Sequence, residues 1–212
     1  MSGARPTGLE GFALRRADLD PNPYVQLRAW MREAEEVGVP EPTATTLATV
    51  DEECRPSVRA VLLKEVRDGE GLVFYTNYQS RKARQLDANP WCALELLWTP
   101  CLRQVSVEGR TRRLPHEEAE AYFATRPRES QLGAWASAQS EPIASRAELD
   151  ARYAEVEKRF RDRDVPCPPH WGGYLVEPTS FQFWQARPGR MHDRFRYAPT
   201  PAGGWSITRL QP

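Results

Sequence analysis

The sequence has no net charge, no long apolar run and no signal-peptide pattern. Its 29 Lys and Arg residues balance 29 Asp and Glu residues, so no overall field draws the chain to nucleic acid or to a membrane surface. No stretch approaches the roughly 20 apolar residues of a membrane span. The first residues, MSGARPTGLEGF, lack a basic segment followed by an apolar one. We therefore expect a cytoplasmic protein without a nucleic-acid or membrane partner.

Metal-binding and dinucleotide-binding motifs are missing as well. The four cysteines are scattered without CxxC spacing, which is typical of reduced thiols outside a metal centre. The three histidines show no metal-ligand spacing either, so we expect no bound metal. No GxGxxG sequence follows an expected strand, and a Rossmann dinucleotide site is therefore not supported.

What the chain does contain is a series of strands joined by short turns. Such a series favours an antiparallel barrel over a doubly wound sheet, and Gly109 is expected to mark a β-bulge. Residues 1–22 predict a mobile N-terminal arm, and residues 23–212 predict a single domain. Expected strands cover 45–50, 59–64, 72–76, 92–98, 102–113, 171–176, 181–185 and 205–210, and expected helices cover 23–37, 81–89, 115–125 and 146–161.

The stretch from Arg59 to Lys82 carries the first candidate site. It predicts two strands joined by a turn, followed by a helix whose N-cap is Ser80. Arg81 then falls in the first helical turn with Lys82, where free N–H groups already favour an anion and cations are usually disfavoured. A bound phosphate would compensate for both cations; the alternative is a solvated basic surface. Arg59 and Lys64 are five residues apart, so their side chains should point to opposite faces.

A second candidate site follows the helix at 115–125. Tyr122, Arg126 and Ser130 are spaced four apart, but Pro127 interrupts a continuous helix. A turn between two helices is then needed to bring the three side chains together. A phenol, a guanidinium and a hydroxyl that converge make a phosphate pocket. The alternative is a polar cluster that joins two helices.

A third group lies near the C-terminus. Arg190, His192 and Arg194 alternate, which would place them on one face of an extended segment. Three cationic or titratable groups on one face repel each other unless an anion or an electron-rich ring is bound there, and His192 can change charge near neutral pH. The alternative is a solvated edge strand.

Four motifs in these regions resemble those of the pyridoxamine 5′-phosphate oxidase family: RxVLLK, FYTNxxSRKxxQ, YFxxRPxxSQxGAW and WQxxxxRxHDR. The resemblance extends from about Leu14 to Pro212, whereas residues 1–13 do not match the basic, tyrosine-containing arm of the best-known bacterial members. It implies a mainly β fold, an FMN-binding split β-barrel of about six antiparallel strands with surrounding helices. It also implies a homodimer in which both chains build each FMN site at the interface.

The resemblance also assigns roles to residues. Gln139, Ser140, Trp184 and Arg194 would then lie across the interface from Arg59 and Lys82. Arg190 and His192 would be the catalytic residues. The substrate phosphate and ring would be bound by Lys64, Tyr122, Arg126, Ser130, Arg190 and His192. FMN would be bound by Arg59, Ala60, Val61, Leu62, Leu63, Lys64, Tyr75, Thr76, Ser80, Arg81, Lys82, Gln104, Gln139, Ser140, Trp184 and Arg194.

By this resemblance the protein is expected to oxidise pyridoxamine 5′-phosphate and pyridoxine 5′-phosphate to pyridoxal 5′-phosphate. FMN is the expected cofactor, and O2 is reduced to H2O2. The alternative is a non-catalytic split-barrel protein that carries flavin or pyridoxal phosphate. A simple flavin carrier requires neither the second phosphate pocket nor the pair Arg190 and His192. A split-barrel reductase using another flavin or haem does not predict YFxxRPxxSQ.

Overall fold

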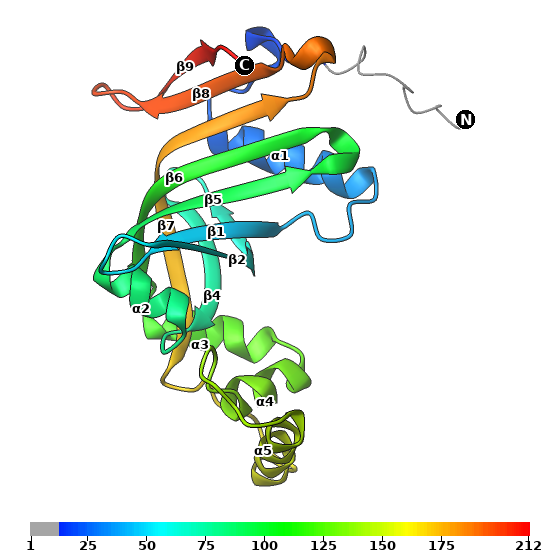
Figure 1. Cartoon of the computed structure of the whole chain (residues 1–212), viewed down its shortest axis with the longest axis vertical. Coiled ribbons are helices and arrows are strands. Elements are labelled where there is room, and N and C mark those ends of the chain that lie inside the picture. Colours follow the sequence, from blue (N-terminus) through cyan, green and yellow to red (C-terminus); the bar gives the residue numbers. More distant parts are fainter. Residues whose placement is uncertain (1–12) are drawn as a thin grey trace.

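The computed structural model describes residues 13–212, which form a nine-stranded sheet flanked by helices (Figure 1). The strands follow the order β2-β1-β5-β6-β7-β4-β3, and β8 and β9 extend the sheet from β7. The strands are β1 (Ala44–Val50), β2 (Pro56–Leu62), β3 (Glu65–Arg67), β4 (Gly71–Asn77), β5 (Trp91–Trp98), β6 (Arg103–Arg113), β7 (Trp171–Gln185), β8 (Asp193–Pro199) and β9 (Trp205–Leu210). The helices are α1 (Pro23–Glu36), α2 (Arg81–Ala88), α3 (His116–Thr125), α4 (Arg128–Ala136) and α5 (Arg146–Arg159).

Strand β7 holds the sheet together because it pairs with three other strands. Its first half pairs with β4, its second half pairs with β8, and β6 runs along its other edge. All of these pairings are antiparallel. The β6–β7 register shifts between Glu108 and Gly109, which confirms the predicted bulge at Gly109. A Cβ at Gly109 would lie 2.3 Å from the Glu177 carbonyl oxygen, so this close approach of two strands requires glycine.

Helix α1 covers the upper part of the sheet. Asn22 accepts a hydrogen bond from the N–H of Tyr24, Pro23 is the first helical residue, and the chain leaves the helix before Gly38. The buried face of α1 packs Trp30 against Phe183 of β7 in an edge-to-face arrangement, with the two ring centroids 5.1 Å apart. The predicted amphipathic helix is therefore confirmed, and its stripe is core packing.

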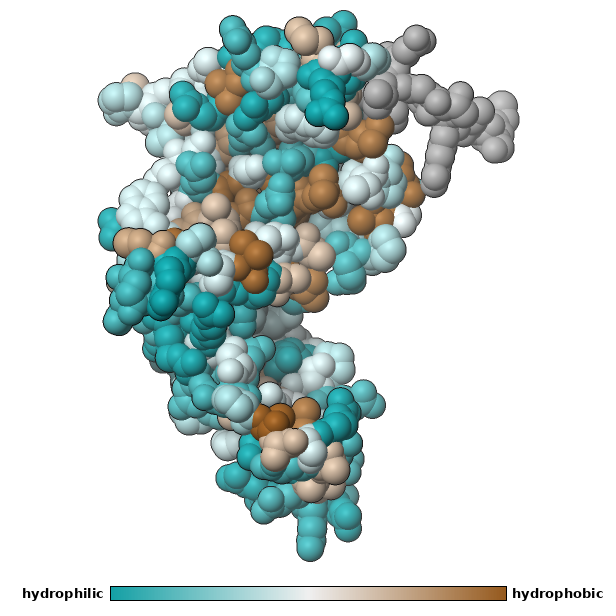
Figure 2. Space-filling view, viewed as in Figure 1, coloured by the Kyte–Doolittle hydropathy of each residue, from teal (hydrophilic) through white to brown (hydrophobic). Residues whose placement is uncertain are grey.

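Helices α3, α4 and α5 form a lobe beside the start of β7 (Figure 1). Figure 2 shows a mainly hydrophilic surface on this lobe, with the molecule narrowing between the lobe and the sheet. A separate apolar cluster holds the lobe together, and it includes Phe123, Leu132, Phe160 and Trp171. Trp171 is also the first residue of β7, so this cluster fixes the lobe to the sheet.

The pairing of one predicted strand and the number of strands differ from the structure. The segment with Arg59 does not form a hairpin with β4. Strand β2 pairs instead with β1, and the hairpin that includes β4 begins at Glu65. The reason lies in Leu63, whose side chain is buried in the core and whose N–H donates to the Thr43 carbonyl. The chain therefore leaves β2 after Leu62 and crosses to the other edge of the sheet. The strand count of nine also exceeds the expected six or so.

The N-terminal segment is packed where it is described. Residues 1–12 of the predicted arm lie outside the described residues. Beyond them, Leu14 and Leu19 are both buried in the main core. In residues 13–212, no helix has the length and apolar character needed to cross a membrane. Nor do three or more His, Cys, Asp or Glu side chains of this part of the chain gather as a possible metal site.

Candidate active site

A cavity of about 600 Å³ lies between the sheet and the α3–α4 lobe, a size typical of small-molecule sites. One wall comes from β2 and the chain after it, a second wall from β4, and a third from α3, α4 and the loop that follows α4. The lining residues are Ala60, Val61, Leu62, Lys64, Tyr75, Thr76, Asn77, Lys82, Tyr122, Thr125, Arg126, Pro127, Ser130, Gly133, Ala134, Ser137, Gln139 and Trp171.

The turn between α3 and α4 brings the second predicted group together. Helix α3 ends at Thr125, and α4 starts after Pro127, so Tyr122, Arg126 and Ser130 face one cavity. Lys64 reaches the same cavity from the end of β2. The predicted convergence of these four side chains is therefore found, by the helix–turn–helix geometry that Pro127 requires.

Arg126 is the most unusual member of this group. Its guanidinium carbon lies 4.6 Å from the ring centroid of Trp171, and its Nη1 is buried without a hydrogen-bond partner. Burial lowers the pKa of Arg126, and the nearby Tyr122 partly offsets this effect. A buried guanidinium nitrogen without an acceptor is costly, and an anion in the cavity would provide one.

A group of nearly parallel aromatic rings forms the side of the cavity. The Tyr75 and Tyr122 ring centroids are 4.0 Å apart, and the Tyr75 and Trp171 centroids are 5.3 Å apart. Gly173 permits this packing, because a Cβ there would lie 2.9 Å from the Tyr75 ring. Sequence reasoning missed Trp171, although the Gly172-Gly173 pair that follows it was a signal of close packing.

Lys82 forms a second basic centre in the same cavity. Its Nζ donates to Gln139 Oε1 at 3.0 Å and to Thr76 Oγ1 at 3.2 Å, and only 8% of the residue is exposed. Burial, followed by the charge of Arg59, lowers the pKa of Lys82 to about 8. All of these hydrogen-bond partners are neutral, so the charge of Lys82 is not balanced by an acid. Ser80 is fully buried as the predicted N-cap of α2, where its side chain accepts from Ala83.

Arg59 points away from the cavity lined by Lys64, as the spacing predicted. Its guanidinium donates to Thr49 Oγ1 and Ser57 Oγ, each at 2.6 Å, and to Gln85 Oε1 at 3.2 Å. Burial lowers the pKa of Arg59, and Arg81 lowers it further. Arg59, Arg81 and Lys82 thus raise the positive potential at the start of α2, where an anion is favoured.

Several predicted residues lie elsewhere than expected. Leu63 contributes its side chain to the core. Ser140 is exposed in a left-handed turn with φ of 75°. Gln139 lies beside Lys82 of its own chain, so the expectation that Gln139 faces Lys82 across an interface is wrong. The reason is that the chain after α4 folds back over β4, where Gln139 also accepts from Thr76.

The C-terminal residues form a separate cluster. Trp184 of β7 is paired with Gln104 of β6 and with Arg194 of β8. The His192 ring lies 4.6 Å from the Trp184 ring, and Arg194 Nε is buried without a hydrogen-bond partner. The cavity residues of the described chain include none of these side chains.

The expected extended segment at 190–194 is also incorrect. Residues Pro188–Arg190 form a 3-10 turn, and β8 begins only at Asp193. Arg190 has a left-handed backbone with φ of 60°, and it is exposed. Alternating side-chain directions apply only to extended backbone, so Arg190 and Arg194 do not share one strand face. A non-glycine residue in this conformation is strained, and such strain is enriched at functional sites.

Comparison with known proteins agrees with this geometry. Residues 31–160 match the family model described as pyridoxamine 5′-phosphate oxidase. The chain belongs to the pyridoxamine 5′-phosphate oxidase family. Residues 171–212 match a second family model, the pyridoxine 5′-phosphate oxidase C-terminal dimerisation region, and this match covers the separate C-terminal cluster.

Curated relatives and solved structures support the same membership. A pyridoxine/pyridoxamine 5′-phosphate oxidase of Burkholderia mallei is 52% identical over 208 residues, covering 97% of this chain and 96% of the relative. Another from Bordetella petrii is 52% identical over 191 residues, covering 90% of each chain. The crystal structure of PhzG from Burkholderia lata, in complex with tetrahydrophenazine-1-carboxylic acid, has a TM-score of 0.87 and 31% identity, covering 94% of this chain and 98% of PhzG.

The split-barrel fold is shared more widely than the sequence. A pyridoxamine 5′-phosphate oxidase-related, FMN binding protein from Nostoc punctiforme has a TM-score of 0.73 at 16% identity, and it covers 92% of this chain. With the family match, this likeness confirms the predicted mainly β, antiparallel split-barrel fold. The protein is thus an oxidoreductase of the pyridoxamine 5′-phosphate oxidase family.

Proposed function

We propose that this protein oxidises pyridoxamine 5′-phosphate and pyridoxine 5′-phosphate to pyridoxal 5′-phosphate, with FMN as cofactor and O2 reduced to H2O2. The observation that carries the proposal is the unpaired, buried Nη1 of Arg126 in a cavity that also contains Lys64, Tyr122 and Ser130. This group suits a phosphate. Lys82 forms a second basic centre in the same cavity, as expected when cofactor and substrate each bring one phosphate.

The residues around Lys82 fit FMN. The positive charges of Arg59, Arg81 and Lys82 suit a single phosphate at the start of α2, and the hydrogen-bond acceptors of Arg59 and Lys82 are all neutral groups. Ala60, Val61 and Leu62 line the adjoining wall of the cavity, next to which a flat ring system can lie. When bound there, FMN would accept two electrons from the substrate carbon and pass them to O2.

The chain's own residues would bind and orient the substrate. Arg126 offers a planar pair of N–H donors to the substrate phosphate, and Lys64 adds a second charge. Burial, and then the charge of Glu65, raise the pKa of Tyr75 to about 12, so this phenol stays protonated near neutral pH. Phosphate binding at a distance from the reacting carbon holds that carbon in one place, which lowers the entropic part of the barrier.

We further propose that the active form is a homodimer. Arg190 and His192 lie in the segment that matches the family's dimerisation region, and within one chain they do not line the cavity. A partner subunit would bring its Trp184 and Arg194 to FMN and its Arg190 and His192 to the substrate ring. There the Nε2–H of the His192 imidazole can donate a hydrogen bond to the substrate, and Arg190 can stabilise negative charge.

Two other functions make different predictions about the substrate. A PhzG-like enzyme would act on a carboxylic acid without a phosphate, whereas a carrier would bind flavin or pyridoxal phosphate without turnover. The Arg126 group and the 52% identity to curated oxidases favour the phosphate substrate.

A substrate comparison tests the proposal. Peroxide formation by the flavin-loaded protein is measured with pyridoxine 5′-phosphate, with unphosphorylated pyridoxine and with tetrahydrophenazine-1-carboxylic acid. We expect kcat/KM for the phosphate ester to exceed that for pyridoxine by at least about a hundredfold. Pyridoxine has no phosphate to bind Lys64, Tyr122, Arg126 and Ser130. Preference for the carboxylic acid would replace the proposal with the PhzG-like reaction.

A further inference from the structure

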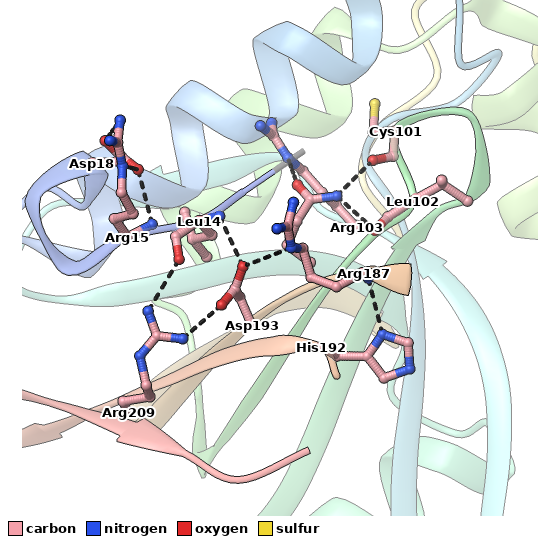
Figure 3. A network of polar contacts seen from close by, with 11 residues as sticks. Leu14, Arg15, Asp18, Cys101, Leu102, Arg103, Arg187, His192, Asp193 and Arg209 are labelled. Carbon is pink, nitrogen blue, oxygen red and sulfur yellow. Dashed lines mark hydrogen bonds and ion pairs between the residues drawn. The ribbon is translucent and has the colours of Figure 1, made fainter. Parts of the chain in front are cut away.

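Residues 186–192 form the loop between β7 and β8, and this loop carries Arg190 and His192. The last paired residues below the loop are Gln185 and Asp193. Figure 3 shows that Asp193 lies at the base of the loop, among side chains from the N-terminal segment and from β9. The side chain of Asp193 is only 14% exposed, so its charge is largely removed from solvent.

The carboxylate of Asp193 joins three separate parts of the chain. Its Oδ1 accepts from Arg209 Nη1 at 2.6 Å, and its Oδ2 accepts from the N–H of Leu14 at 3.0 Å. Oδ2 also lies 3.6 Å from Arg187 Nε across the neck of the loop. Arg209 closes the arrangement, because its Nη2 donates to the Leu14 carbonyl at 3.3 Å. Leu14 itself is buried in the core, so the N-terminal segment is a fixed support.

Arg187, at the start of this loop, also determines the tautomer of His192. The backbone N–H of Arg187 donates to His192 Nδ1 at 3.1 Å. A backbone N–H can only donate, so Nδ1 must accept, and the neutral imidazole carries its proton on Nε2. The ring is held against Trp184, with centroids 4.6 Å apart. Moving Arg187 would therefore release both the tautomer and the orientation of His192.

We propose that Asp193 is a positioning residue, which holds the loop so that Arg187 fixes His192 in its Nε2–H tautomer and presents Arg190 outward. This inference rests on the proposed function for the role of His192 and Arg190 in turnover. We call the contacts of Asp193 with Leu14, Arg187 and Arg209 the Asp193 clamp, and all of them lie within one chain. The clamp includes the N–H of Leu14, so it joins parts of the chain that lie far apart in the sequence.

The test uses the flavin-loaded protein and two readouts. Asp193→Asn keeps the shape of the side chain but removes its charge, and Arg209→Gln removes the opposite side of the clamp. Asp18→Asn is the matched control, because Asp18 pairs with Arg15 on the same N-terminal segment. The first readout is steady-state peroxide formation with pyridoxine 5′-phosphate. The second is the tautomer of His192 from proton–nitrogen NMR spectra at about pH 8.5, where an ordinary histidine is neutral. With three histidines in the chain, His192→Asn assigns the signal.

We expect Asp193→Asn and Arg209→Gln each to lower kcat at least about tenfold, with KM changed less than about threefold, since a displaced catalytic group affects turnover more than phosphate binding. Both variants should show a mixture of His192 tautomers, whereas the wild type and Asp18→Asn show the Nε2–H form. Unchanged tautomers in both variants would overturn the clamp, whatever happens to kcat. If Asp193→Asn does not fold, Arg209→Gln decides alone. If the two variants show altered His192 tautomers but the wild type forms no peroxide, the clamp is retained and the proposed function is rejected.

Discussion

Lys82 Nζ lies 3.0 Å from Gln139 Oε1, although 57 residues separate the two in sequence. This contact joins the start of α2 to the loop after α4, and it closes one end of the cavity. Because Gln139 is neutral, it satisfies a donor of Lys82 without balancing its charge. The free protein thus has a buried cation whose hydrogen-bond partners are all neutral, and binding of an anion there would balance its charge.

FMN affinity should depend on pH through Lys82. The pKa of Lys82 is about 8 in the free protein, and a bound phosphate would raise it because an anion favours the charged form. Affinity should be full below about pH 8 and should fall as the pH rises above that value, by up to about tenfold per pH unit. Fluorescence titration of the flavin-free protein with FMN between about pH 7 and pH 9.5 measures this. Lys82→Met should bind FMN weakly with a flat profile, and an equally flat wild-type profile would reject the assignment.

The same substitution should stabilise the flavin-free protein. Lys82 has a lower pKa when folded than its ordinary 10.5, so the unfolded state binds more protons between about pH 8 and pH 10.5. Stability of the wild type should therefore rise with pH across this window. At pH 7, Lys82→Met removes a buried charge and should gain about 1–2 kcal/mol, less the lost hydrogen bonds to Thr76 and Gln139. Urea unfolding at fixed protein concentration checks both the sign and the pH trend.

Arg126 should affect substrate binding and leave flavin binding unchanged. Arg126→Met removes a charge-assisted contact worth about 1.5–3 kcal/mol that is present in ground and transition states alike, so KM should rise at least about tenfold. Steady-state peroxide production with pyridoxine 5′-phosphate measures KM, and the visible spectrum measures flavin content. Arg152→Met is a matched control, since Arg152 pairs with Glu148 on the surface of α5. A KM like that of the wild type would show that the phosphate binds elsewhere.

Mixed dimers should recover the activity that two single variants lack. Arg190→Met is expected to lower kcat. If both subunits build each site, one subunit supplies Arg126 and the other supplies Arg190, so a mixed dimer of the two variants keeps one site with both arginines. Random mixing makes half of the dimers mixed, and each mixed dimer has one intact site of two, so about a quarter of wild-type activity should return. Co-expression with two affinity tags isolates the mixed dimer, which should show about half of wild-type activity because one of its two sites is intact. Activity no higher than that of the separate variants would place both arginines in one chain's site.

Much of the local structure could be predicted because it depends on neighbouring residues. The Ser80 cap, the bulge at Gly109 and the convergence of Tyr122 with Arg126 all follow from short-range rules. Strand partners could not be predicted, because the same periodicity allows β2 to pair with β1 or with β4. The burial of Leu63, which decides between them, depends on the whole core.

The candidate site was harder to predict where tertiary contacts override local pattern. Trp171 was missed because its partners, Tyr75 and Tyr122, come from distant elements. The extended segment at Arg190 was wrong because Pro188 and Gly189 begin a 3-10 turn in the loop above Asp193. Alternation in sequence cannot distinguish such a loop from a strand when the charged residues stand two apart.

The central claim is turnover, and one measurement tests it most directly. Flavin-loaded wild-type protein is mixed with pyridoxine 5′-phosphate, and O2 consumed, H2O2 formed and pyridoxal 5′-phosphate formed are measured together, with the released flavin identified by chromatography. We predict equimolar amounts of all three over many turnovers, with FMN as the released flavin. A protein fully loaded with FMN that consumes no O2 and forms no pyridoxal 5′-phosphate would contradict the account and leave a flavin carrier.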